Sequence, residues 1–123
     1  MQHPLLLVAA GALALLGIMH SYLGERFVLS RILALPNLPT LRGSQAYMSS
    51  LLRWAWHLTS IAWWGTAGTL LAMSDGRGPA ASGIVLAITF AIHGSISFGL
   101  SGGRHPAWPL FFLASAAIWF GTR

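Results

Sequence analysis

Charged residues are scarce in this sequence of 123 residues: only 7% are charged, whereas 55% are hydrophobic. Soluble domains average roughly 25% charged residues, so the composition excludes an ordinary soluble protein and indicates a membrane protein. The chain has no lysine, and its net charge of +5 depends on arginine alone. The arginines are spread along the chain and form no dense basic face, so we expect no nucleic acid among the partners.

Cysteine is absent, and Glu25 and Asp75 are the only acidic residues. Without cysteine the chain cannot form a disulfide, a thiolate metal site or an iron–sulfur cluster. The two acids lie at opposite ends of the expected helices, so they provide no carboxylate pair for acid–base catalysis, and we identify no catalytic residue. The remaining chemistry lies in five histidines, which can ligate a metal or carry a proton.

Four stretches are long and apolar enough to cross a membrane, which takes about 20 residues, with a usual range of about 17 to 25. We place these spans at about 5–23, 52–73, 80–100 and 106–120. They predict an all-α fold, a four-helix transmembrane bundle that forms a single domain over residues 1–123. A cleaved signal peptide is the competing interpretation of the first span, but no positively charged segment precedes it, so we expect it to be retained.

Apolar and basic residues alternate between the first two spans, which predicts a short amphipathic helix at the membrane interface. The apolar residues are Phe27, Val28, Leu29, Ile32 and Leu33, and the basic ones are Arg26 and Arg31. Pro36 and Pro39 end this helix, because proline cannot continue a helix.

The arginines near the ends of the spans predict the orientation, since cytoplasmic loops carry the excess of basic residues. One face holds Arg26, Arg31, Arg42, Arg53 and Arg104, and the other holds Arg77 and Arg123. The sequence thus predicts a multi-pass protein of the bacterial inner (cytoplasmic) membrane with both termini outside the cytoplasm.

Four of the histidines are expected in the cytoplasmic half of the bundle, one from each span. A helical rise of about 1.5 Å per residue places them all near the same depth. They are His20, His57, His93 and His105, and only His3 lies elsewhere. Because each histidine comes from a different helix, these four are the candidate metal ligands, with His20 and His57 the firmest pair.

Two further patterns surround these histidines. A stripe three or four residues apart follows the second span, which places its members on one helix face. It comprises Ser50, Arg53, His57, Ser60 and Trp64. Gly17 and Gly24 flank His20 on the first span and leave room for something flat or for a neighbouring helix. We therefore take Arg53, Gly17, Gly24, Ser60 and Trp64 as candidate cofactor-binding residues.

Three interpretations of the histidines stay open. They bind haem b or a transition metal, copper or zinc, in an electron-transfer protein or an accessory subunit. Alternatively, they relay protons in a small proton-coupled transporter. In the third interpretation they are purely structural and bond across helices to serine or threonine. Arg53 could bind a haem propionate or a lipid phosphate, and we expect membrane lipid, further copies of the chain or a larger membrane complex as partners.

Two segments, His20-Ser-Tyr-Leu-Gly-Glu-Arg-Phe and Arg53-Trp-Ala-Trp-His-Leu-Thr-Ser-Ile-Ala-Trp-Trp-Gly, resemble those of small uncharacterised four-span proteins of bacterial inner membranes. The resemblance covers most of the chain and implies a location and an architecture, but no activity. Small multidrug-resistance transporters are similar in length and span number. Their glutamate in the middle of the first span has no counterpart in residues 10–16 here, which speaks against a drug exporter.

Overall fold

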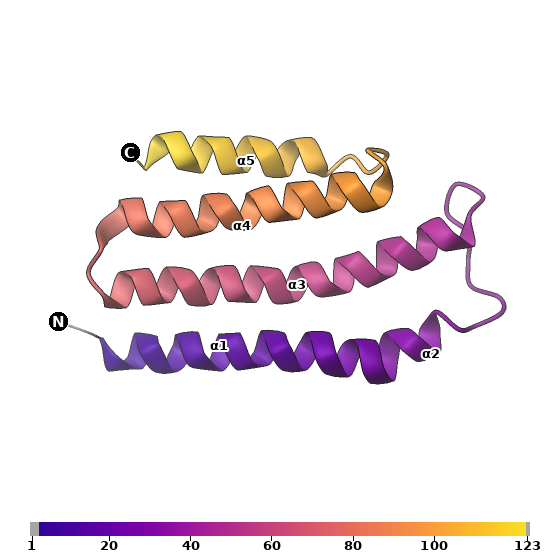
Figure 1. Ribbon diagram of the computed structural model, residues 1–123, viewed down its shortest axis with the longest axis horizontal. Helices are drawn as coiled ribbons and strands as arrows, with labels where there is room; N and C mark the ends of the chain where they lie inside the picture. Colours follow the sequence, from indigo (N-terminus) through magenta and orange to yellow (C-terminus); the bar gives the residue numbers. More distant parts are fainter. Residues whose placement is uncertain (1–2, 123) are drawn as a thin grey trace.

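The computed structural model describes residues 3–122, which form helices and contain no strand (Figure 1). The four long helices are α1 (Pro4–Leu23), α3 (Gln45–Ser74), α4 (Gly78–Ser101) and α5 (Trp108–Gly121). The predicted all-α class is therefore confirmed. The largest difference from the expected ranges is at α3, which begins at Gln45 because the Ser44 hydroxyl accepts a hydrogen bond from the Tyr47 N–H at 3.1 Å and caps the helix.

The segment after α1 differs from the prediction of a separate interfacial helix, which is wrong. α1 continues without a break into the π-helix η1 (Gly24–Leu29) and then into α2 (Ser30–Ile32). The prediction that residues 27–32 are helical is correct. They form no separate element, because Gly24 has ordinary helical angles (φ −59°, ψ −50°) and nothing ends α1 there.

Two helical stretches are long and apolar enough to cross a membrane, Pro4–Ile32 and Gly78–Ser101, with mean hydropathies of 1.9 and 1.8. α5 is apolar but shorter. α3 is long enough, at 30 residues, but polar residues such as Arg53, His57 and Ser60 lower its hydropathy. By length and composition, the described chain therefore offers two membrane-spanning helices.

The helices lie side by side in one layer, in the order α1, α3, α4 and α5 (Figure 1). Each packs against its neighbours in the chain. Within residues 3–122, α1 makes no close approach to α4 or α5, and α3 makes none to α5. The expected four-helix bundle around a common core is therefore not what the packing shows.

Small residues allow the neighbouring helices to approach closely, as is usual between helices in lipid. The largest fully buried side chains are serines, namely Ser60, Ser74, Ser97 and Ser101. Many large apolar side chains instead face outward, including Leu15, Ile18 and Ile88. The accessible surface is 7,553 Å², against about 6,400 Å² for a compact soluble protein of this mass. The layer is thus open and apolar on both faces.

Candidate functional site

Five arginines gather at one end of the layer, where the α1–α3 and α4–α5 connections lie (Figure 1). They are Arg26, Arg31, Arg42, Arg53 and Arg104. Arg77 lies at the opposite end, between α3 and α4, and Arg123 is outside the described residues. The predicted grouping of these five is therefore present in the fold, and we call this the arginine-rich end.

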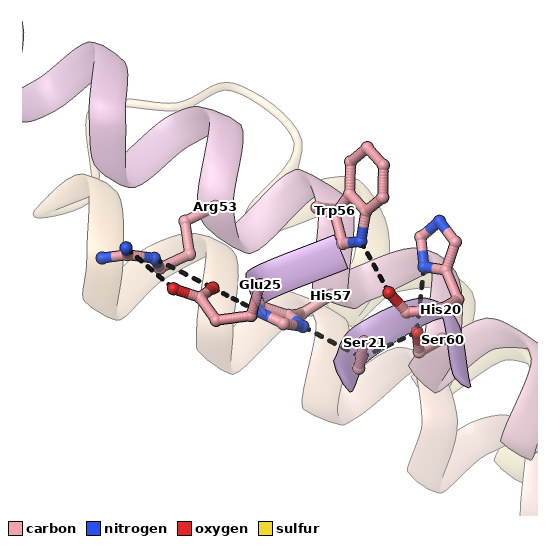
Figure 2. Close-up of polar contacts among 7 residues, drawn as sticks. All are labelled: His20, Ser21, Glu25, Arg53, Trp56, His57 and Ser60. Carbon is pink, nitrogen blue, oxygen red and sulfur yellow. Dashed lines mark hydrogen bonds and ion pairs between the residues drawn. The ribbon is translucent and has the colours of Figure 1, made fainter. Parts of the chain in front are cut away.

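A chain of polar contacts joins α1 and η1 to α3 near this end (Figure 2). The Glu25 carboxylate lies 3.2 Å from Nε2 of His57, whose Nδ1 lies 2.9 Å from Oγ of Ser21. The Ser21 hydroxyl lies 2.8 Å from the hydroxyl of Ser60, which lies 3.2 Å from Nδ1 of His20. We call this sequence of residues, from Glu25 to His20, the His–Ser chain.

Arg53 holds the outer end of the His–Ser chain. Its guanidinium contacts both oxygens of Glu25, with Nη2 at 2.9 Å from Oε1 and Nε at 3.2 Å from Oε2. The same Oε2 faces His57, so the carboxylate lies between two basic groups. The two side chains are half exposed, at 51% for Arg53 and 42% for Glu25, so the pair itself adds little to stability.

Helical spacing explains why these side chains meet. Arg53, His57 and Ser60 share one face of α3, as the stripe in the sequence predicted. On the other helix, Ser21 and Glu25 are four residues apart and face α3. The π-helix η1 begins at Gly24, next to Glu25, and such segments occur frequently at functional sites.

The space beside Gly17 and Gly24 is filled by tryptophans of α3. A Cβ atom on Gly24 would collide with the Trp56 indole, and one on Gly17 with the Trp64 indole. Trp56 also stacks on the His20 ring, with centroids 4.5 Å apart, and its Nε1 donates to the His20 carbonyl at 3.0 Å. The glycines therefore admit a neighbouring helix, and the flat group beside His20 is an indole of this chain.

His93 lies in a different interface, between α3 and α4. It is buried, with 6% of its surface exposed. Its Nδ1 lies 2.8 Å from the Thr89 carbonyl and its Nε2 lies 3.2 Å from the Leu58 carbonyl. Backbone oxygens thus lie within hydrogen-bond distance of both ring nitrogens, of which a neutral ring donates through one, and the contacts describe a structural histidine between helices.

His105 lies in the turn before α5. Its Nδ1 accepts a hydrogen bond from the Ala107 N–H at 3.2 Å, and its ring packs edge-on against Trp54, with centroids 5.1 Å apart. These contacts fix the turn rather than form a ligand site.

The four histidines lie at one level but not in one cluster. His20 contacts Ser60, His93 contacts the Leu58 carbonyl and His105 contacts Trp54, so all lie beside the short segment 54–60 of α3, which includes His57. His20 and His57 are connected through serines on the α1 side, whereas His93 and His105 contact other residues. The fold brings together the pair and leaves the other two apart.

No group of three or more potential metal-ligating side chains occurs among residues 3–122. Within the His–Ser chain, Nε2 of His57 and the Glu25 carboxylate are the closest pair of potential ligands. Arg53 already neutralises that carboxylate, so a metal cation there would compete with a guanidinium. Haem, copper and zinc remain predictions from the sequence, and these contacts add no support for them.

The candidate residues from the sequence did not include Glu25 or Trp56, whereas Ser21 was covered by the interpretation in which the histidines bond across helices to serine. Glu25 pairs with Arg53 and also contacts His57. The four-residue spacing of Ser21 and Glu25 was the available signal, because it matches that of Arg53 and His57 on the facing helix.

The chain matches no family model, no curated protein and no solved structure.

Proposed function

We propose that this protein is a four-span protein of the bacterial inner membrane in which the His–Ser chain relays a proton. The relay begins at Glu25 and Arg53 at the arginine-rich end and reaches inward to His20. The single observation that carries the proposal is the unbroken chain of contacts from a carboxylate through two imidazoles and two hydroxyls (Figure 2).

The hydrogen-bonding capacity of the chain supports a shared proton. If His57 carries two protons, it donates to both Glu25 and Ser21, Ser21 donates to Ser60, and Ser60 donates to His20. If the extra proton is on His20 instead, every bond between His20 and His57 reverses. His20 then donates to Ser60, Ser60 donates to Ser21, and Ser21 donates to Nδ1 of His57. Hydroxyl hydrogens rotate freely between such partners, so both arrangements satisfy every contact without moving a heavy atom.

The relay serves one side of the membrane. Glu25 and His20 are five residues apart, or about 7.5 Å along the helix axis. Residues 4–17 of α1, beyond His20, carry no polar side chain. The chain of polar contacts therefore ends at His20, within the membrane. His20 there lines a groove that is otherwise apolar, with Leu16, Leu23 and Phe27 among its walls. This arrangement favours proton exchange with a membrane partner, as in an accessory subunit, over transport by this chain alone.

Four spans and their orientation belong to the same proposal. α3 and α5 run antiparallel to α1 and α4, with which they alternate in the layer. α3 has 30 residues and is about 45 Å long. α5 has 14 residues and is about 21 Å long, short of the usual hydrocarbon core of about 30 Å. The five gathered arginines favour the cytoplasm for their end and the outside for both termini.

Histidine titration followed by nitrogen-15 nuclear magnetic resonance tests the relay. We expect His20 and His57 to titrate as a coupled pair, with the signals of both rings changing in each of two steps. Ser21→Ala should uncouple them because it removes one hydroxyl of the chain. Thr59→Ala is the matched control, since among residues 3–122 the Thr59 hydroxyl bonds only to the Ala55 carbonyl of its own helix.

Independent titration of the two rings in the unmodified protein would overturn the relay. A Soret absorbance band that disappears in His57→Ala would instead support haem binding. Proton flux into vesicles that contain only this protein, if lost in the same variant, would favour the transporter interpretation.

A further inference from the structure

A second feature of the arginine-rich end lies next to the His–Ser chain. It is a groove of about 400 Å³ between α3 and α4. Ser50, Arg53 and His57 line its polar part, and Ile61, Ile96 and Leu100 line its apolar part. The volume is within the range of small-ligand sites, about 300 to 1,000 Å³.

The polar and apolar parts of the groove follow one another along α3. Ser50, Arg53 and His57 come first, and Ile61 lies eight residues beyond Arg53, or about 12 Å further from the arginine-rich end. α4 supplies apolar residues opposite, at Ile96 and Leu100. A ligand that fits must therefore have a polar head at the membrane surface and an apolar tail directed inward.

Arg53 has hydrogen-bonding capacity left for such a head. Its contacts with Glu25 use Nε and Nη2, whereas a guanidinium carries five N–H donors. Among residues 3–122 the structure gives Nη1 of Arg53 no partner, and the side chain is 51% exposed. Arginine recognises phosphate through its planar fork, so a second anion can bind beside Glu25.

The charge around the groove selects the sign of the head group. The arginine-rich end carries five arginines, and Glu25 is the single acidic side chain among the described residues there. Basic pockets between membrane helices on the cytoplasmic side bind anionic lipid head groups. An acyl chain matches the isoleucine and leucine walls, whereas free phosphate would leave them uncovered.

We infer that the groove between α3 and α4 is a binding site for an anionic phospholipid. The phosphate binds the free edge of Arg53 beside Ser50, and one acyl chain lies against Ile61, Ile96 and Leu100. The groove shares Arg53 and His57 with the proton relay, but its apolar walls at Ile61, Ile96 and Leu100 take no part in the His–Ser chain.

Native mass spectrometry of the full chain in detergent tests this inference, with phosphatidylglycerol and phosphatidylcholine as probes. We expect the unmodified protein to retain phosphatidylglycerol in preference to phosphatidylcholine by about fivefold, the effect of one arginine near a lipid surface. Arg53→Gln should abolish the preference by removing the guanidinium. Ile96→Trp should abolish it as well, by filling the groove from α4 without touching the Arg53–Glu25 pair.

Arg77→Gln is the matched control, because it removes one arginine from the opposite end of the layer and should leave the preference unchanged. Inorganic phosphate should not displace the bound lipid, since it cannot occupy the apolar walls. Equal retention of the two lipids overturns the inference, and so does a preference that persists in either Arg53→Gln or Ile96→Trp. If Arg53→Gln does not fold, Ile96→Trp decides the question. Histidine titration of Ile96→Trp reads the relay separately, so failure of one proposal is distinguishable from failure of the other.

Discussion

Replacing Ser60 with alanine tests directly whether the His–Ser chain holds α1 against α3. Ser60 is fully buried, and its hydroxyl contacts Ser21 at 2.8 Å and His20 at 3.2 Å. Ser60→Ala removes both contacts and leaves the two partly buried partners, Ser21 and His20, without them. Interhelical hydrogen bonds in membranes average about 0.6 kcal/mol and reach about 1.7 kcal/mol. We therefore expect the free energy of unfolding to fall by about 1 to 3 kcal/mol.

Ser97 provides a matched control on α4. It is also fully buried, but its hydroxyl has no hydrogen-bond partner among the described residues. Ser97→Ala removes the same atom from an equally buried site and breaks no side-chain bond. Because an unpartnered buried hydroxyl is itself unfavourable, this change should be neutral or stabilising by up to about 1 kcal/mol.

Reversible unfolding in sodium dodecyl sulfate, followed by tryptophan fluorescence, measures both variants. Trp56 and Trp63 pack against His20, so the signal of the six tryptophans includes this interface. Equal stabilities of Ser60→Ala and Ser97→Ala would refute the reasoning, since they would show that the contacts of Ser60 add no more than an unpartnered hydroxyl does.

Three further predictions concern packing, orientation and cofactor content. Gly24→Ala should lower the free energy of unfolding by about 1 to 3 kcal/mol in the same assay because its Cβ collides with Trp56. The control Gly11→Ala, whose Cβ meets nothing within 4 Å, should be neutral or stabilising. Equal losses of stability in the two variants would contradict this packing. A reporter enzyme that works only outside the cytoplasm should be active when it is fused after Arg123. Activity of a fused reporter that works only in the cytoplasm would show the opposite orientation. Purified protein should show no Soret band dependent on His57, because indoles occupy the flat space beside the histidine pair; visible absorbance and metal analysis check this.

Hydrophobicity and helical rise were sufficient to predict the level of the histidines. The expected depths of His20, His57, His93 and His105 follow from counting residues to the ends of the spans, and the structure places all of them beside the same short segment of α3. Depth is a property of each helix separately, so the sequence of one helix suffices to predict it.

Lateral neighbours could not be predicted in the same way. A bundle and a single layer have the same helix lengths, the same alternation of direction and the same depths. In the layer α1 does not approach α4 or α5, so His20 cannot meet His93 or His105 directly. His20 and His57 are joined through Ser60 and Ser21 because consecutive antiparallel helices are neighbours in both arrangements.

The role of the glycines was only partly predictable. The sequence indicated that Gly17 and Gly24 leave space beside His20 but not what fills it. Trp56 and Trp64 occupy that space from α3, which depends on the rotation of α3 about its own axis. A weak polar stripe does not define that rotation well, and this is why Trp56 was missed.

The single layer also has a consequence for how the protein is made. Because each helix packs only against its neighbours in the chain, stability is approximately a sum of separate interfaces, as in repeat proteins. The hairpin of α1 and α3 contains every member of the His–Ser chain, and its partners are complete once Ser60 has been synthesised. The site can therefore assemble during translation, before α4 and α5 have been synthesised.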